Sequence, residues 1–295
     1  QYLDCYFNQL TSLDVSQNTV LIELNCYSNQ LTSLDVSNNF ALTDLSCKNN
    51  QLTSLDVSNN TILETLTFKD NNITSIDVST LTVLESLRCH QNQLTTLNVS
   101  NNTLLTTLTC AGNQLTSLDV SNNTALTYLH IGGDTHLGTT NLITSLNLSN
   151  NTSLETLYCG FNQLTTLDVS TLTALTYLDC SNEVTLSNYA SGVGSGLLTT
   201  LDVSNNTALT YLRCSFNQLT SLDLRNGNNT NMVYTNSFYT NGQGPITIGN
   251  YTLLTIHVDN VAWSNSNWPL AIGDVNKEGN GHVGYGDTIL ITNNQ

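Results

Sequence analysis

Eight cysteines recur at a nearly fixed spacing, and thiols are the residues of this sequence that most directly suggest chemistry. Where a unit lacks cysteine, Phe68 or Ile131 takes its place, and most steps are then 21 residues. Evenly spaced cysteines can form disulfides, bind zinc or fill a core. The apolar replacements favour packing, because a free thiol behaves as a small hydrophobe. The cysteines are Cys5, Cys26, Cys47, Cys89, Cys110, Cys159, Cys180 and Cys214.

Geometry argues against the two reactive alternatives. If each cysteine lies on its own coil of a stacked repeat, neighbouring coils stand about 4.8 Å apart. A disulfide needs β-carbons about 3.8 Å apart with a strongly skewed torsion. A zinc site needs ligands that converge on one point, whereas a ladder of parallel side chains diverges. The sequence therefore predicts eight reduced, buried cysteines.

The elements that must position these thiols follow from the repeat L-x-x-L-x-C-x-x-N-Q-L-T-x-L-D-V-S-x-N-T-x. Leu24-x-Cys26 and Leu34-x-Val36 both alternate with period two, as strands do. This pattern predicts a repeat solenoid of 21-residue coils with little helix, a parallel β-sheet on the front face, and short strands or turns on the back. We expect the asparagine after each cysteine to bond the backbone of the next coil: Asn29, Asn50, Asn92, Asn113, Asn162 and Asn217.

The repeat also predicts the domain organisation. About ten units fill residues 1–226, and the longer steps of 28 and 34 residues mark insertions near 134–140 and 183–196. Both insertions follow the front strand, so we expect them at one rim of the solenoid. Residues 227–295 depart from the repeat and are predicted to form an irregular C-terminal cap.

The unit resembles the leucine-rich repeat, whose frame is L-x-x-L-x-L-x-x-N-x-L. With cysteine in the third leucine position and a 21-residue period, it is similar to the cysteine-ladder repeats of the internalin J type and of exported Bacteroidetes proteins. The resemblance covers residues 1–226, and "YTLLTIHVDNVAWSNSNW" at 251–268 resembles the closing segment of the Bacteroidetes repeats. It implies a secreted or bacterial cell-surface protein that acts in adhesion or protein binding and is not an enzyme. No binding residue can be carried over, because the strand-surface residues follow no family motif.

The net charge of the chain limits the kinds of partner that it is expected to bind. The chain has 6 basic and 22 acidic residues, a formal net charge of -16, which argues against nucleic acid and anionic membranes as partners. The apolar runs are too short to insert into a bilayer. No secretory signal is present and Gln1 falls inside the repeat, so we interpret the chain as a mature or trimmed fragment.

The predicted front face carries the variable residues. It holds four of the six basic residues and seven of the twelve tyrosines, whereas the back repeats Ser, Thr and Asp. Tyrosine and arginine are favoured interface anchors. The alternative is unselected variation on a solvated sheet. We predict a surface that recognises a protein or glycan ligand, with Arg213 anchoring a carboxylate. The candidate residues are Tyr128, Tyr158, Tyr177, Tyr211, Arg213, Arg88 and His90.

Metal sites are alternatives that the sequence leaves open. His130, Asp134 and His136 cluster in the first insertion, and the back-face aspartates recur once per coil, a sparse ligand set for calcium. The segment "GDVNKEGNGHVGYGD" resembles a calcium loop, but its closing acid comes two positions late. We therefore predict a glycine-rich cap and no cofactor, with calcium as the alternative on Asp274, Asn276, Glu278 and Asp287.

Other functional classes are less well supported. There is no G-x-S-x-G motif, and the aspartates are periodic and not paired, so the residues do not indicate an enzyme. A structural protein that self-associates end to end into a surface assembly is a distinct alternative to a monomeric binder. Concentration-dependent light scattering separates these two.

Overall fold

The computed structural model describes residues 1–133, 139–182, 196–214 and 217–228, and the backbone of three strands at 246–247, 254–257 and 289–292. The chain forms two compact units, residues 1–151 and 152–295. Several predicted features lie outside the described residues: Asp134, His136, most of both insertions, and the calcium candidates Asp274, Asn276, Glu278 and Asp287.

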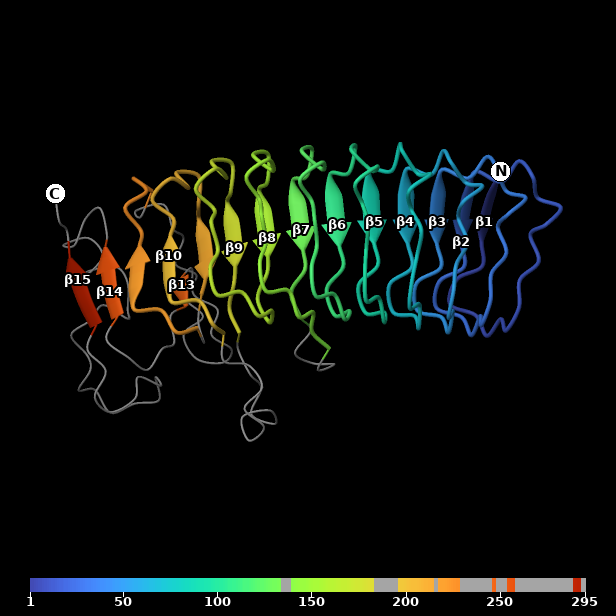
Figure 1. Ribbon diagram of the computed structural model, residues 1–295. Helices are drawn as coiled ribbons and strands as arrows, with labels where there is room; N and C mark the ends of the chain where they lie inside the picture. The colour runs from blue at the N-terminus through green and yellow to red at the C-terminus, as the bar shows by residue number, and fades with distance from the viewer. Residues whose placement is uncertain are drawn as a thin grey trace, which may run out of the picture. The chain divides into compact units, whose positions relative to one another are not determined.

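The first unit is a stack of coils, each with one three-residue strand on its front (Figure 1). Every strand pairs in parallel with the next, and the partners are residues 21 apart, such as Leu24 and Leu45. This confirms the predicted 21-residue coil and its parallel front sheet. The strands are β1 Tyr2–Asp4, β2 Glu23–Asn25, β3 Asp44–Ser46, β4 Thr65–Thr67, β5 Ser86–Arg88, β6 Thr107–Thr109 and β7 Tyr128–His130.

The second unit contains parallel strands in two sheets. One sheet orders β8 Thr156–Tyr158, β9 Tyr177–Asp179, β11 Tyr211–Arg213 and β13 Ile246–Thr247. The other orders β10 Thr200–Asp202, β12 Ser221–Asp223, β14 Leu254–His257 and β15 Ile289–Thr292. Strands from beyond residue 226 thus pair with both sheets of their unit. The predicted boundary between repeats and cap at 226 remains a prediction.

The back face differs between the two units. In the described part of residues 1–151 the back carries turns and no strand, whereas β10 and β12 are back strands of the second unit. The recurring aspartate contributes to the turns. Asp56 accepts the backbone amide of Ser58 through Oδ1 at 2.9 Å, and the same contact returns at most coils. Asp202 and Asp223, which end β10 and β12, make the same contact, so it does not account for the difference between the units.

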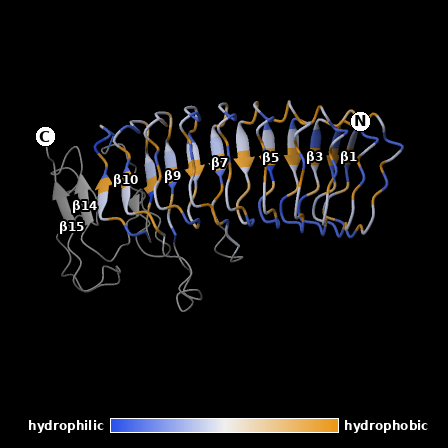
Figure 2. Ribbon diagram, in the orientation of Figure 1, coloured by the Kyte–Doolittle hydropathy of each residue, from blue (hydrophilic) through white to orange (hydrophobic). Residues whose placement is uncertain are grey.

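The core lies between the front strands and the back turns (Figure 2). The inward residues Leu24, Cys26, Leu31 and Val36 are fully buried, as their alternation predicts. Phe68 fills the cysteine position of its coil and is also fully buried.

All eight cysteines are free, as predicted, and seven of them are buried. Cys5, on the first coil, is half-buried. Burial raises the pKa of Cys26 to about 12, with a smaller contribution from Cys5, and burial raises the pKa of Cys110 to about 12. These thiols therefore remain protonated at neutral pH and serve as packing groups.

We expect native protein to react slowly with a thiol reagent and to expose eight thiols on denaturation. Cys110→Ser should cost about 1–3 kcal/mol of unfolding free energy, because it buries a hydroxyl in an apolar position. Cys110→Ala should cost less, since it removes only packing contacts. Urea unfolding of both variants tests this order. A serine variant as stable as wild type would contradict the packing role.

A left-handed turn follows seven of the front strands. The residue two positions after the cysteine has a φ between 51° and 58° in seven coils, although only Gly112 is a glycine. Such a conformation costs a non-glycine residue roughly 1–2 kcal/mol. The turn precedes the ladder asparagine and directs its side chain into the coil. The other six are Phe7, Ser28, Asn49, Asp70, Gln91 and Phe161.

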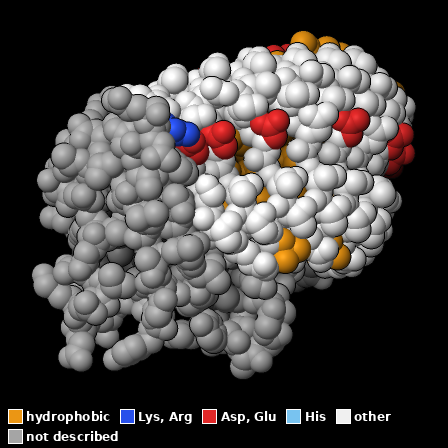
Figure 3. All heavy atoms as spheres, turned by 60° about the vertical axis from the view of Figure 1, so that its left-hand side comes forward, with side chains coloured by type: hydrophobic (Ala, Val, Ile, Leu, Met, Phe, Trp, Pro, Cys, Tyr) orange, Lys and Arg blue, Asp and Glu red, His pale blue; other side chains and the backbone are white. Residues whose placement is uncertain are grey.

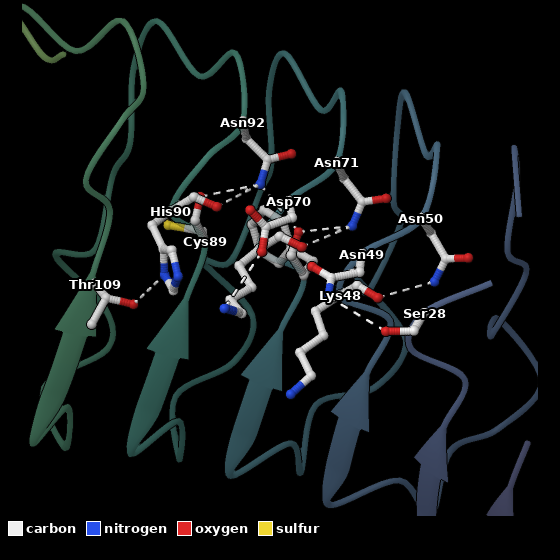
Figure 4. Close-up of polar contacts among 12 residues, drawn as sticks. Ser28, Lys48, Asn49, Asn50, Asp70, Asn71, Cys89, His90, Asn92 and Thr109 are labelled. Carbon is white, nitrogen blue, oxygen red and sulfur yellow. Dashed lines mark hydrogen bonds and ion pairs between the residues drawn. The ribbon is translucent and has the colours of Figure 1, made fainter. Parts of the chain in front are cut away.

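The predicted asparagine ladder is present, but it binds the preceding coil and not the next one (Figure 4). Asn50 donates from Nδ2 to the carbonyls of Cys26 and Cys47 at 3.1 and 3.0 Å, and its Oδ1 accepts the amide of Leu31 at 3.0 Å. The structure adds Asn71 and Asn141 to the predicted members.

A second asparagine ladder was missed by the sequence analysis. Asn60 is fully buried and donates to the carbonyls of Val36 and Asn39 at 3.0 and 2.9 Å. Equivalent asparagines repeat this contact, and Leu81 and Leu172 occupy the same position in two coils. The asparagine of the S-x-N-T part of the repeat is the sequence signal for this ladder. The other members are Asn39, Asn102, Asn123, Asn151 and Asn206.

Candidate functional site on the front sheet

Three of the predicted tyrosines form a ladder on the front of the second unit. The rings of Tyr177 and Tyr211 stack with centroids 4.3 Å apart and planes 6° apart. Tyr158 lies on the other side of Tyr177, with centroids 4.8 Å apart and an interplanar angle of 36°. Tyr177 and Tyr211 are directly paired across β9 and β11. All three side chains are half-buried, so the ladder presents ring edges to solvent.

Arg213 lies beside this ladder, but its surroundings differ from the prediction. Its Nη1 is 3.3 Å from Oδ2 of Asp179 on the paired strand, and both side chains are mostly buried. Asp179 also accepts the amide of Ser181 at 3.0 Å. The guanidinium thus pairs with a carboxylate of the same sheet, and its role as an anchor for a ligand carboxylate stays a prediction.

The other predicted residues lie in the first unit. Arg88 ends β5 and is exposed, His90 follows two residues later, and Tyr128 begins β7. His90 contacts the hydroxyl of Thr109 through Nδ1 at 3.0 Å (Figure 4). Burial, and then the nearby Lys69, lower the pKa of His90 to about 4. The imidazole is therefore neutral at neutral pH.

An aromatic cluster at the start of the first unit was not among the predicted site residues. Tyr6 and Tyr27 stack with centroids 4.5 Å apart and planes 2° apart, and Phe7 meets both rings edge-on. The ammonium of Lys48 lies 4.3 Å from the centroid of the Tyr27 ring. Tyr6, Tyr27 and Lys48 share one position of consecutive coils, so aligning the repeat column by column could have identified them.

The first insertion is tied to an earlier coil. The hydroxyl of Thr139 donates to Oε1 of Gln91 at 2.7 Å, across 48 residues of sequence. The side chain of Gln91 crosses Gly112, where an added Cβ would lie 2.6 Å from Nε2. The asparagine ladder that follows the cysteines resumes at Asn141, whose side chain donates to the carbonyls of Cys110 and Ile131, both at 3.0 Å. The insertion therefore leaves the coil register intact.

The back face carries separated acidic side chains on a surface with few other charges (Figure 3). The amide of Ser58, followed by its hydroxyl, lowers the pKa of Asp56, and the neighbouring Asp35 and Asp77 oppose this with smaller effects. These carboxylates serve as turn acceptors. No group of three or more His, Cys, Asp or Glu side chains within the described ranges is arranged to hold a metal ion. The described residues likewise include no helix long and apolar enough to cross a membrane.

The architecture of the chain is similar to that of several solved structures. No family model and no curated protein matches the chain. The functional domain of internalin J from Listeria monocytogenes, which includes a cysteine ladder, is 39% identical with a TM-score of 0.71. The match covers 87% of this chain and 54% of that domain, so the chain spans about half of its length.

Two further solved structures share the fold alone. A leucine-rich repeat protein of Leptospira interrogans is 24% identical with a TM-score of 0.62, over 85% of this chain and 70% of that one. Internalin F of Listeria monocytogenes is 22% identical with a TM-score of 0.55, over 88% and 82%. By its repeat, its parallel coils and these similarities, the chain is a leucine-rich repeat solenoid with a cysteine ladder, similar to internalin J.

Proposed function

We propose that the chain is an extracellular binding or adhesion module whose front sheet recognises a protein or glycan ligand on a cell surface. The observation that carries this proposal is the tyrosine ladder formed by Tyr158, Tyr177 and Tyr211. Packing inside the coils does not require these side chains, because the core is filled by the inward leucines and cysteines. Half-exposed tyrosines beside a fixed ion pair form a rigid surface that loses little entropy on binding.

The similarity to internalin J supports a role in binding over catalysis. The described residues also lack a metal cluster that would suggest hydrolysis. A nucleophile with its base is likewise not indicated by the sequence motifs. The ligand itself is left to experiment.

The tyrosine ladder leads to a direct prediction. Replacing Tyr177 and Tyr211 together by Ser should abolish attachment to immobilised cell-surface proteins and glycans, because hot-spot tyrosines each contribute about 2 kcal/mol or more. Replacing both by Phe keeps the stack and should retain most attachment. Tyr2→Ser is the matched control, since Tyr2 occupies the equivalent strand position and is 71% exposed.

Attachment and melting temperature should be measured on the same samples. If the Ser variant melts lower but attaches as well as wild type, the ladder only stabilises the sheet. The binding surface would then have to lie elsewhere on the chain.

A further inference from the structure

Large apolar side chains are exposed in a row along one rim of the first unit. They precede the front strands β2 to β6, one on each of five consecutive coils, and each is between 37% and 56% exposed. These strands begin at the upper rim in Figure 1, and Figure 3 shows hydrophobic side chains at the upper edge of the molecule. We call the five residues the apolar row: Val20, Phe40, Ile62, Val83 and Leu104.

The coil itself does not require these large side chains. Each member of the row except Phe40 directly precedes the inward leucine of its coil. Small residues take the same position in coils that form equally regular front strands: Ala125, Ser153, Ala174 and Ala208. Contiguous apolar side chains left in solvent mark a surface that another molecule covers. The row is therefore a candidate docking surface.

One acidic residue per coil accompanies the apolar row on four of its five coils. Ile62 and Glu64 are exposed on either side of a fully buried leucine, as are Val83 and Glu85. Because side chains alternate along an extended segment, each such pair faces the same side. On the two preceding coils the acid follows the apolar residue by three or four positions. We call these acids the acidic row: Glu23, Asp44, Glu64 and Glu85.

Backbone hydrogen bonds hold the two rows in register. The amide of Glu64 donates to the carbonyl of Thr43 at 2.8 Å, and the amide of Glu85 donates to the carbonyl of Glu64 at 2.9 Å. The amide of Thr106 donates to the carbonyl of Glu85 at 2.9 Å. Neighbouring coils therefore place the backbones of their acids about 4.8 Å apart. Like charges in adjacent positions destabilise a sheet, so the fold gains nothing from this grouping.

The cations of the same coils lie at the other end of the strands. Arg88 ends β5, and Lys48 and Lys69 stand two residues beyond the ends of β3 and β4. Lys69 pairs with Asp70, and the ammonium of Lys48 lies over the ring of Tyr27. The ion pairs found among the described residues include no member of the acidic row. The rim thus presents negative charge beside an apolar surface.

We propose that this rim binds a cationic amphipathic segment of a partner protein. The apolar side chains of the segment cover the apolar row, and its lysines or arginines meet the acidic row. The inference goes beyond the proposed recognition by the front sheet and uses no residue of the tyrosine ladder.

The combination of apolar and acidic side chains selects this occupant. A symmetric dimer through the rim would bring the acids of one copy against those of the other. An anionic membrane is repelled by the same acids. A neutral or acidic glycan supplies neither the apolar side chains nor the cations that the two rows call for. A protein segment that alternates apolar and basic residues supplies both.

The test uses a synthetic peptide of leucine and lysine, with its leucines spaced as on an amphipathic helix. It is titrated against the whole chain by calorimetry at several salt concentrations. Two control peptides separate the contributions of charge and apolar contact. In one, glutamate replaces every lysine, and in the other, serine replaces every leucine.

Two double variants test the two rows separately. Ile62→Ala with Val83→Ala shortens the apolar row, and alanine occurs naturally in this position of other coils. Glu64→Gln with Glu85→Gln removes two charges of the acidic row. The melting temperature of each variant confirms its fold.

Each double variant has a matched control elsewhere on the chain. Leu142→Ala shortens a side chain that is 43% exposed and follows a front strand instead of preceding one. Glu155→Gln removes an acid from the same repeat position as Glu64, but next to Ser153, where the apolar row is absent.

We expect the leucine–lysine peptide to bind, and its affinity to fall as salt is raised. Both control peptides should bind about tenfold or more weakly. The apolar variant should lose about tenfold in affinity and the acidic variant severalfold, whereas the two matched controls should bind as wild type.

Several results would overturn the inference. They are the absence of binding to the leucine–lysine peptide, equal binding of either control peptide, unchanged binding by either double variant, and equal losses in the matched controls. Peptide binding that is lost only when Tyr177 and Tyr211 are replaced by Ser would refute this site while leaving the proposed function intact.

Discussion

Asn113→Leu should destabilise the first unit by about 3–5 kcal/mol, because one side chain satisfies several buried backbone groups. Its Nδ2 donates to the carbonyls of Cys89, Cys110 and Ala111 at 3.1, 3.0 and 3.3 Å. Its Oδ1 accepts the amide of Leu94 at 3.0 Å. Leucine has nearly the same volume but leaves the Leu94 amide buried without this acceptor. Urea unfolding followed by circular dichroism measures the loss.

The second ladder provides the matched control. Asn102→Leu should cost about 1 kcal/mol or less. The two carbonyls that Asn102 binds, those of Val78 and Leu81, also accept backbone amides at 3.0 and 3.2 Å. Its own Oδ1 has no hydrogen-bond partner among the described residues, and leucine occurs naturally in this position at Leu81. Equal losses for the two variants would show that the first ladder is not the stronger link between coils.

Gly160→Ala should strongly destabilise the second unit. A Cβ on Gly160 would lie 1.9 Å from the carbonyl oxygen of Ser181 and 3.0 Å from its carbonyl carbon. Ser181 is only 2% exposed, so its backbone cannot move aside without disturbing the packing of β9. Overpacking of this kind costs about 3 kcal/mol or more. We expect lower soluble yield and a lower urea midpoint.

Gly112→Ala is the matched control for this prediction. Its φ of 58° disfavours alanine by roughly 1–2 kcal/mol, but the added methyl meets only the flexible side chain of Gln91. The loss should therefore be smaller than at Gly160. If the Gly160 variant proved the more stable of the two, the close approach of Ser181 would not constrain the coil.

Both contrasts show that residues which look alike in the sequence differ in the groups that they contact. Asn113 and Asn102 look alike in the sequence, yet only one of them supplies an acceptor to an otherwise unpaired amide. On the front sheet, the positions beside the inward leucines of β8, β9 and β11 carry the tyrosine ladder.

The sequence by itself determined the coil. The 21-residue period, the alternation around Leu24 and Cys26, and the apolar replacement at Phe68 predicted the parallel front sheet, its buried side chains and the free cysteines. These features are local or repeat at a constant interval. The pattern of one unit therefore gives the buried positions of the others.

Only the tertiary structure decided how side chains meet between coils. The asparagine ladder binds the preceding coil, and the repeat spacing does not reveal which neighbouring coil a side chain meets. Nor does it reveal the sign of φ at residues such as Phe7 or Gln91. Arg213 was predicted as a ligand anchor, but it pairs with Asp179, which lies 34 residues away in sequence and on the neighbouring strand in space. A spacing fixes which residues share a face. The orientations of their side chains depend on packing against residues from other coils.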